Sequence, residues 1–294
     1  MKGFVTIATG DERYYQMAAN LLTSYRLFSK EPYPFAIIAD KENQYTAQFD
    51  KVVILKEPKR SYMDKIELII YAPYDETIFI DADCLAYGDL NAYWSWFEGC
   101  SDFSSFGLSR KLDYKGGFYD YEGTGTFKEK ISYLTHLHGG TYFIRKGKAC
   151  DEMLETCRYI IEHYDDFTFN MFNDAPADEP VFALAMSVHN MKSVEAPSGF
   201  LCFYPCCTYF QSDISKGMAE YSVPWLGKDT IIKDTYCVHW GNVNTSGAVY
   251  RLEEYRLNKM ATQKRLNGID IWRKRMMLNC AYNWSRVKRK FTGR

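Results

Sequence analysis

Four short apolar runs, separated by segments with helical periodicity, constrain the fold of this chain more than any other feature of its sequence. The runs are Phe4–Ala8, Phe35–Ala39, Val52–Leu55 and Thr77–Ile80. Such runs are typical of strands that a parallel sheet buries on both faces. From Tyr14 to Phe28, apolar residues recur at helical spacing, which predicts an amphipathic helix that packs on the sheet. The alternation predicts an α/β, Rossmann-like fold with a mostly parallel central sheet flanked by helices.

Beyond these runs, the chain continues to alternate between helix and strand patterns. We expect helices at Met63–Ile70, Lys148–Tyr164 and Val181–Val188, and strands at Thr141–Arg145, Ser193–Ala196, Phe200–Tyr204 and Thr235–Trp240. Residues Gly107–Gly140 are rich in glycine, tyrosine and charge and show little periodicity. Long loops inside a compact domain are usually functional or mobile. We interpret this stretch as a substrate-facing loop, with a plain surface excursion as the alternative.

Two carboxylates, Asp81 and Asp83, directly follow the fourth run and are separated only by Ala82. In an extended backbone, side chains at i and i+2 lie on the same side, so both carboxylates face one point. Open α/β sheets bind their ligands at the carboxyl ends of strands. Oxygen ligands there suit a hard divalent ion, Mg²⁺ or Mn²⁺, that carries a phosphorylated substrate. The alternative is an Asx turn, in which both side chains accept hydrogen bonds from nearby backbone.

The composition is that of a globular protein. The chain has 294 residues, of which 47% are hydrophobic, enough to bury a sizeable core. No run approaches the eighteen or so apolar residues of a membrane span, and the first residues lead into a strand pattern rather than a signal peptide. We therefore expect a cytoplasmic protein. Nine cysteines without a repeated spacing indicate free thiols rather than a disulfide framework.

The carboxyl-terminal stretch differs from the rest of the chain in charge. Residues 251–294 contain thirteen Lys or Arg against three acidic residues. Between Ile269 and Phe291, basic side chains are interleaved with Trp272, Met276 and Trp284, which suits a helix lying on an anionic membrane surface. An ordinary helix that packs its apolar side on the domain is the alternative. We therefore divide the chain into residues 1–248 and a basic, aromatic, helical extension at 249–294.

The order of these motifs resembles that of GT-A glycosyltransferases, in particular the family 8 type that includes glycogenin and bacterial lipopolysaccharide galactosyltransferases. The resemblance covers residues 3–245 and implies a GT-A fold with a nucleotide-sugar site. Its most specific parts are Phe4–Thr9, Lys65, Phe79–Asp83 with Gly88–Leu90 after it, and His239–Gly241.

The resemblance implies a metal centre and a phosphate-binding residue. Asp81, Asp83 and His239 are expected to bind Mn²⁺ or Mg²⁺, which bridges the diphosphate of a nucleotide sugar. Lys65 is expected to contact the donor phosphate or sugar. A histidine on its own is more often a core or surface residue, and a lone lysine on a helix is often a solvated charge.

The resemblance also places Asp178 and Glu179 near the anomeric carbon of the donor. A carboxylate there can stabilise an oxocarbenium-like centre, act as a nucleophile or take the acceptor proton, and the sequence leaves these roles open. Asp178 also stands where a helix N-cap is expected, before Pro180 in the first turn, so a capping role is the alternative.

The remaining donor-site residues are assigned by the same resemblance. Tyr14 is expected to stack on the base, although it also suits the first core position of its helix. Two departures concern donor contacts: Gly139–Thr141 replaces an Asn-Ser-Gly-like turn, and Asn242 follows Gly241 where relatives often continue to Lys-Pro-Trp. Together with Lys65 and Asp81, the assigned set is Ala8, Thr9, Tyr14, Ala82, Gly140, Gly241 and Asn242.

The sequence thus predicts a metal-dependent glycosyltransferase. It is expected to move a hexose from a nucleotide-diphosphate sugar, with UDP as the expected nucleotide, to a glycan or glycolipid acceptor with retention of configuration. It is expected in the cytoplasm, with peripheral contact to an anionic inner membrane surface through residues 269–291. The alternatives are a glycosyltransferase acting on protein or nucleic acid, and a catalytically silent nucleotide-sugar-binding module.

Overall fold

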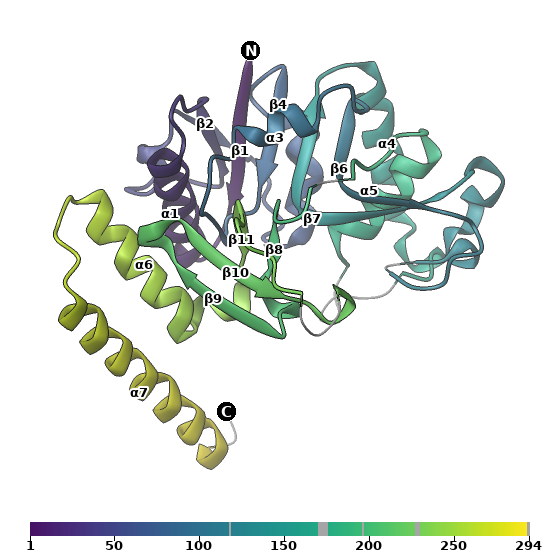
Figure 1. Cartoon of the computed structure of the whole chain (residues 1–294). Coiled ribbons are helices and arrows are strands. Elements are labelled where there is room, and N and C mark those ends of the chain that lie inside the picture. The colour runs from purple at the N-terminus through teal and green to yellow at the C-terminus, as the bar shows by residue number, and fades with distance from the viewer. Residues whose placement is uncertain (118, 170–175, 196, 227–229, 293–294) are drawn as a thin grey trace. The chain divides into compact units, whose positions relative to one another are not determined.

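The computed structural model describes residues 1–117, 119–169, 176–195, 197–226 and 230–292, with side chains up to residue 281 (Figure 1). The described chain forms two compact units, each made of separate stretches. The first unit comprises residues 1–19, 33–82 and 91–197, and the second comprises residues 20–32, 83–90 and 198–294. Helix α1 (Glu12–Phe28) contributes residues to both units.

The first unit contains a six-stranded sheet in the order β3-β2-β1-β4-β7-β6. Strands β1 to β4 pair in parallel, and β7 runs antiparallel to both β4 and β6. The apolar runs form these strands because β1, β2 and β4 are buried almost throughout. The strands are β1 (Lys2–Ala8), β2 (Phe35–Ala39), β3 (Lys51–Ile54), β4 (Glu76–Ile80), β6 (Phe103–Arg110) and β7 (Leu134–Arg145).

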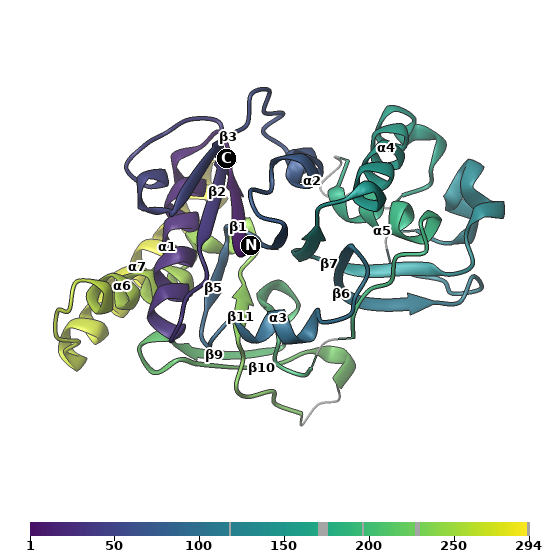
Figure 2. The ribbon, with the colours of Figure 1, turned by 90° about the horizontal axis from the view of Figure 1, so that it is seen from above.

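Helices cover this sheet and close its core. Helix α5 packs on β7 and α4 packs on α5, and Figure 2 shows both helices beside β7. The ring of Phe182 on α5 stacks on Phe103 of β6 at 4.7 Å between centroids. Burial of one such side chain stabilises a fold by roughly 1.5–3 kcal/mol. The α-helices lying wholly in this unit are α2 (Leu68–Tyr71), α3 (Ala92–Trp96), α4 (Lys148–Glu162) and α5 (Asp178–Val188).

Three expectations for this unit need correction. Residues Gly107–Gly140 were expected to form a loop, but β6 and β7 extend into both ends of the stretch and pair with each other. The middle holds a 3₁₀ segment, Tyr121–Lys130. The helix expected at Met63–Ile70 is instead a 3₁₀ segment, Tyr62–Glu67, followed by the single turn of α2. The strand expected at Ser193–Ala196 is reduced, in the described residues, to an isolated bridge between Val194 and Phe106. Residue 196 lies outside the described residues.

The second unit contains two small sheets and the carboxyl-terminal helices. Strand β11 pairs antiparallel with β5 and parallel with β8, while β9 and β10 form an antiparallel pair. The buried ring of Trp240 packs against Tyr204, Phe210 and Tyr250. The elements are β5 (Cys84–Ala86), β8 (Cys202–Phe203), β9 (Tyr209–Asp213), β10 (Met218–Ser222), β11 (Cys237–His239), α6 (Ala248–Ala261) and α7 (Gly268–Thr292). Short 3₁₀ segments complete the described chain at 46–48, 164–166, 204–206, 214–216, 224–226 and 242–246.

The carboxyl-terminal stretch is helical, as expected. Along the described side chains of α7, Trp272 and Met277 are 62% and 68% exposed, so this part does not bury its apolar residues. The side chains of Trp284 and Phe291 lie outside the described part. Among the helices that the structure describes, none has the length and hydropathy of a membrane crossing. The nine cysteines are free thiols, as the sequence predicts.

Candidate active site

Asp81 lies directly after β4, at the carboxyl end of that strand. Its backbone N–H donates to the carbonyl oxygen of Gly140 at 3.0 Å, which fixes the end of β4 beside β7. Its Oδ1 accepts the N–H of the next residue, Ala82, at 3.1 Å, a contact with local backbone but not the bond to residue i+2 that defines an Asx turn. Its Oδ2 accepts a hydrogen bond from Lys65 Nζ at 2.7 Å. The turn interpretation is therefore incomplete, because the same carboxylate also pairs with a buried cation.

The ammonium group of Lys65 is a positive charge buried in the first unit. It lies on the 3₁₀ segment before α2, is only 9% exposed, and places Nζ 3.6 Å from Asp178 Oδ2 and 3.3 Å from the carbonyl oxygen of Gly139. Burial alone lowers the pKa of a lysine, but the charges of Asp178 and Asp81 outweigh it and raise the pKa of Lys65 well above its usual value. The alternative of a solvated helix charge is wrong, and Lys65 stays protonated between two carboxylates.

Asp178 is the first residue of α5 rather than its N-cap, which is Ala177, so the capping interpretation is wrong. The Asp178 side chain is 4% exposed and accepts a hydrogen bond from the Tyr142 hydroxyl at 2.6 Å. Burial raises the pKa of Asp178, and this effect outweighs the opposing effects of Lys65 and the Tyr142 hydrogen bond. Asp178 is thus a carboxyl group that holds a proton more readily than an exposed aspartate does.

Glu179 lies beside Gly139, one residue before the glycine assigned to the donor. Its Oε1 accepts the backbone N–H of Gly139 at 2.5 Å. A Cβ at position 139 would lie 2.4 Å from that oxygen, closer than any side chain tolerates. Glycine at position 139 therefore allows β7 to approach α5 closely, and this packing is a structural reason for glycine there.

Tyr142 is a member of this network that the sequence did not single out. It is fully buried on β7, and its ring stacks on Phe79 of β4 at 5.6 Å. In a strand, residues i and i+2 share a face, so Tyr142 lies on the same side of β7 as Gly140. That spacing was the available signal, but the contact with Asp178 depends on a residue 36 positions away in the sequence.

Ala8 and Thr9 mark the carboxyl end of β1. Ala8 is 2% exposed, and the Thr9 hydroxyl donates to Asp64 Oδ2 at 2.8 Å. Asp64 precedes Lys65 on the same 3₁₀ segment, so this segment connects the end of β1 to the lysine network. Tyr14 lies half-buried in the first turn of α1, where the Arg13 side chain lies over its ring, while the neighbouring Tyr15 takes the buried core position.

In the second unit, Asp83 and His239 form a close pair. Strands β5 and β11 place His239 opposite Cys84, the residue after Asp83. The distance between Asp83 Oδ1 and His239 Nε2 is 3.0 Å, and the two side chains are 10% and 12% exposed. The ring of Phe203 packs on the imidazole at 5.1 Å. The pair is thus nearly buried and offers a carboxylate oxygen and an imidazole nitrogen side by side.

The residues after β11 turn the chain sharply. Gly241 has a φ of 67°, a left-handed conformation that favours glycine, and is the N-cap of the following 3₁₀ segment. Asn242 is the first residue of that segment. Both therefore lie shortly after β11, with Trp240 between His239 and Gly241, and their contact with the donor stays a prediction.

The donor set at these positions suits a divalent ion. The division between the units falls between Ala82 and Asp83, so Asp81 and the Asp83–His239 pair belong to different units. The covalent chain nevertheless keeps the two aspartates within two Cα steps of about 3.8 Å each. Carboxylate oxygens suit Mg²⁺ and Mn²⁺, and the imidazole nitrogen favours a transition-metal ion such as Mn²⁺ over Mg²⁺. The facing ligand atoms of Asp83 and His239 fit such an ion.

Comparison with known proteins gives structural matches only. No protein-family model and no curated protein matches the sequence. The solved structure of the bifunctional glycosyltransferase WbbM matches 93% of this chain and 51% of its own, with a TM-score of 0.51 and 10% identity. The galactosyltransferase LgtC, solved with donor and acceptor sugar analogues, matches 94% of this chain and all of its own, with a TM-score of 0.49 and 15% identity.

A third match is glycosyltransferase GlyE of Streptococcus pneumoniae TIGR4, over 66% of this chain and 45% of its own, with a TM-score of 0.42 and 13% identity. The chain thus spans about half the length of WbbM and less than half of GlyE. The likeness to WbbM, together with the mostly parallel sheet, gives this chain the α/β fold of GT-A glycosyltransferases. The fold predicted from the sequence is confirmed.

Proposed function

We propose that this protein is a metal-dependent glycosyltransferase that transfers a hexose from a nucleotide-diphosphate sugar, with UDP as the nucleotide, to a glycan or glycolipid acceptor with retention of configuration. One observation carries the proposal. A buried lysine lies between Asp81 and Asp178 at the carboxyl end of β4. Two residues after Asp81, Asp83 pairs with His239. Open α/β sheets bind their ligands at such strand ends.

The metal site in this proposal consists of Asp81, Asp83 and His239, each of which offers one ligand atom. The fold class and the donor set both favour Mn²⁺ or Mg²⁺. When bound, the ion would neutralise charge on the diphosphate leaving group. Asp81 and Lys65 form an ion pair, so Lys65 holds the Asp81 carboxylate in place beside the phosphate site.

The remaining roles in this proposal are those that the family resemblance implies. Lys65 presents an ammonium group to the donor phosphate or sugar. Asp178 and Glu179 lie at the start of α5 and orient the sugar or act at its anomeric carbon. Ala8, Thr9 and Tyr14 hold the base and ribose, and Ala82, Gly140, Gly241 and Asn242 complete the donor site.

The acceptor in this proposal is carried by a membrane or by a surface glycan. Residues 1–248 form the transferase domain, and residues 249–294 form the extension that meets the acceptor. The exposed Trp272 and Met277 on α7, next to Arg273–Arg275, support a peripheral contact with anionic lipid at the inner membrane surface. Sedimentation with anionic vesicles tests this contact: removal of residues 268–294 should abolish binding, and equal binding without them would exclude it.

Donor hydrolysis tests the proposal as a whole. A panel of nucleotide sugars is incubated with the protein and Mn²⁺, and release of the nucleoside diphosphate is measured. We expect Asp83→Asn to lower the hydrolysis rate by about 100-fold or more, because a charged ligand is lost. Asp113→Asn, at an exposed aspartate of the first unit, is the matched control and should leave the rate unchanged.

Two results would oppose the proposal. Full activity of the Asp83→Asn variant would exclude this metal site. Binding of UDP and Mn²⁺ in calorimetry, without hydrolysis of any donor or transfer to any acceptor, would favour a silent binding module.

A further inference from the structure

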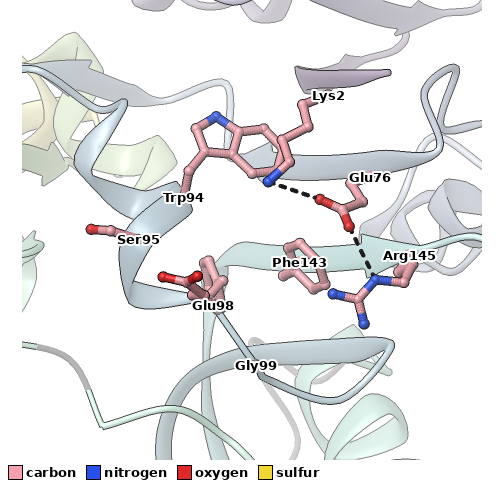
Figure 3. A pocket seen from close by; sticks show the side chains of 9 residues that line it. Lys2, Glu76, Trp94, Ser95, Glu98, Gly99, Phe143 and Arg145 are labelled. Atoms are coloured by element: carbon pink, nitrogen blue, oxygen red, sulfur yellow. Dashed lines mark hydrogen bonds and ion pairs between the residues drawn. The ribbon is translucent and has the colours of Figure 1, made fainter.

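A pocket lies at the opposite edge of the main sheet from the proposed donor site, where β1 and β4 begin and β7 ends. It has a volume of about 370 Å³, within the range of about 300–1,000 Å³ that is typical of small-molecule sites. Lys2, Glu76 and Arg145 line it from the three strands (Figure 3). The lining from α3 and the turn that follows consists of Trp94, Ser95, Phe97, Glu98 and Gly99. Along β1, six residue steps of about 3.3 Å separate this edge from Ala8, so the pocket lies about 20 Å from the proposed donor site.

The charges around this pocket are paired. Glu76 forms ion pairs with Lys2 Nζ at 3.1 Å and with Arg145 Nε at 3.2 Å. Figure 3 shows Glu76 between these two cations. Arg145 Nη1 also pairs with Asp102 at 2.9 Å. Glu98 adds an exposed carboxylate on the α3 side. An anion would meet these carboxylates and a cation would meet Lys2 and Arg145, so the lining favours a neutral ligand.

The pocket nevertheless offers many hydrogen-bonding groups. A guanidinium has five N–H donors. In the described residues, Arg145 uses two of them, one to Glu76 and one to Asp102. Among the described residues, no ion pair involves Glu98, so its two oxygens can accept. The Ser95 hydroxyl donates to the carbonyl of Ala92 at 2.8 Å and keeps its lone pairs. A ligand here would need several groups that both donate and accept.

Aromatic rings form the remaining wall. Lys2 Nζ lies 5.2 Å from the centre of the Trp94 ring, and the Arg145 guanidinium lies 5.2 Å from the centre of the Phe143 ring. These stacking contacts hold both cations against the wall, which fixes the direction of their free N–H groups. A fixed guanidinium fork matches two neighbouring oxygen atoms on one ligand.

We propose that this pocket binds a neutral sugar unit of a glycan, at a site separate from the donor site. Adjacent hydroxyl groups of a sugar both donate and accept, so one pair can receive N–H groups from Arg145 while another donates to Glu98. An apolar ligand would leave these groups unpaired, and a phosphate would face Glu98 and Glu76. The inference rests on the proposed function in one respect, namely that the glycan is the acceptor or product of the transfer. The site then anchors that glycan away from the reacting bond.

Binding of lactose, maltose and cellobiose, measured by saturation-transfer NMR and calorimetry, tests the site. We expect at least one of these neutral disaccharides to bind with millimolar affinity. Glu98→Ala should weaken that binding about 10-fold, because one hydrogen bond to a charged group is lost. Ser95→Trp, at an exposed position that lines the pocket, should abolish the binding by filling the space. Glu129→Ala, at an exposed glutamate elsewhere in the first unit, is the matched control and should bind like the wild type.

The readouts separate this site from the proposed function. Failure of all three disaccharides to bind, or equal binding by the Glu98→Ala and wild-type proteins, would overturn the sugar site. Inorganic phosphate that binds more tightly after Glu98→Ala would overturn it in favour of an anion site. Donor hydrolysis by the wild-type protein is measured separately, so its absence contradicts the proposed function while a sugar affinity that depends on Glu98 still supports the pocket.

Discussion

The two edges of the main sheet both carry networks of opposite charges, but they differ in how far water reaches them. At the carboxyl edge, Lys65 and Asp178 have side chains that are 11% and 4% exposed. At the amino-terminal edge, Lys2 and Glu76 are 48% and 25% exposed, and Arg145 is 37% exposed. Exposed ion pairs contribute about 0–1 kcal/mol, whereas removal of one partner from a buried pair costs about 3–5 kcal/mol. The same residue types therefore have different energetic consequences at the two edges.

The comparison also indicates why the buried network exists. Taking charges out of water is costly, and well-packed apolar residues are often as stabilising as a buried ion pair. A buried lysine between two carboxylates is therefore better explained by a ligand site than by stability. Perturbed pKa values of Asp178 and Lys65, together with their place at strand ends, agree with a functional site.

Replacement of a lysine at each edge gives the largest expected contrast. We predict that Lys65→Met lowers the free energy of unfolding by about 3–5 kcal/mol, because it leaves Asp81 and Asp178 without their cation. Lys2→Met, the matched change in the exposed network, should lower it by less than about 1 kcal/mol. Urea denaturation of both variants at neutral pH measures the difference. Equal losses would show that the two networks do not differ in the way their burial predicts.

The hydroxyl group of Tyr142 gives the next largest effect. We predict that Tyr142→Phe lowers the free energy of unfolding by about 1.5–3 kcal/mol, since the lost hydrogen bond is to a buried carboxylate. Tyr119 is a matched control, because it is also buried but its hydroxyl contacts the neutral Ser187 hydroxyl at 3.3 Å. Tyr119→Phe should cost about 0.5–1.5 kcal/mol. A loss for Tyr142→Phe no larger than for Tyr119→Phe would indicate that Asp178 is neutral or differently bonded.

Much of the carboxyl edge could be predicted from the sequence. Continuous apolar runs identified β1, β2 and β4, because strands buried on both faces need no polar alternation. The run at 52–55 also marked β3, although this edge strand is only half-buried. The rule that ligands bind at the carboxyl ends of strands then selected Asp81 and Asp83 without any structure. Lys65 was assigned through the resemblance alone, since a single lysine on a short helical pattern carries no sign of burial.

The rest depended on contacts between distant parts of the chain. Residues 107–140 gave no strand signal because Gly107, Gly139 and Gly140 weaken the β pattern, yet pairing of β6 with β7 makes strands there. Asp178 matched a helix N-cap locally, but contacts with Tyr142 and Lys65 determine its environment. The amino-terminal pocket had no sequence signal, since Lys2, Glu76 and Arg145 meet only in the folded sheet.

The smallest expected effect concerns pH at the exposed edge. Burial raises the pKa of Glu76, but hydrogen bonds from Lys2 and Arg145 and their charges outweigh it, so the pKa lies below the ordinary value of 4.5. A carboxylate with a lowered pKa in the folded state stabilises the fold above its unfolded pKa, and this contribution is lost as the pH falls through the folded pKa. We predict that Glu76→Gln lowers the free energy of unfolding by less than about 1 kcal/mol at pH 7.

That difference should disappear in acid. Below the lowered pKa, Glu76 is protonated in both the folded and the unfolded state, so it resembles the glutamine of the variant and the ion pairs with Lys2 and Arg145 no longer contribute. Urea denaturation of the wild type and Glu76→Gln from pH 7 down to pH 3 measures the convergence. A difference that grows as the pH falls would mean that Glu76 has a raised pKa, and the amino-terminal edge would then resemble the buried network rather than contrast with it.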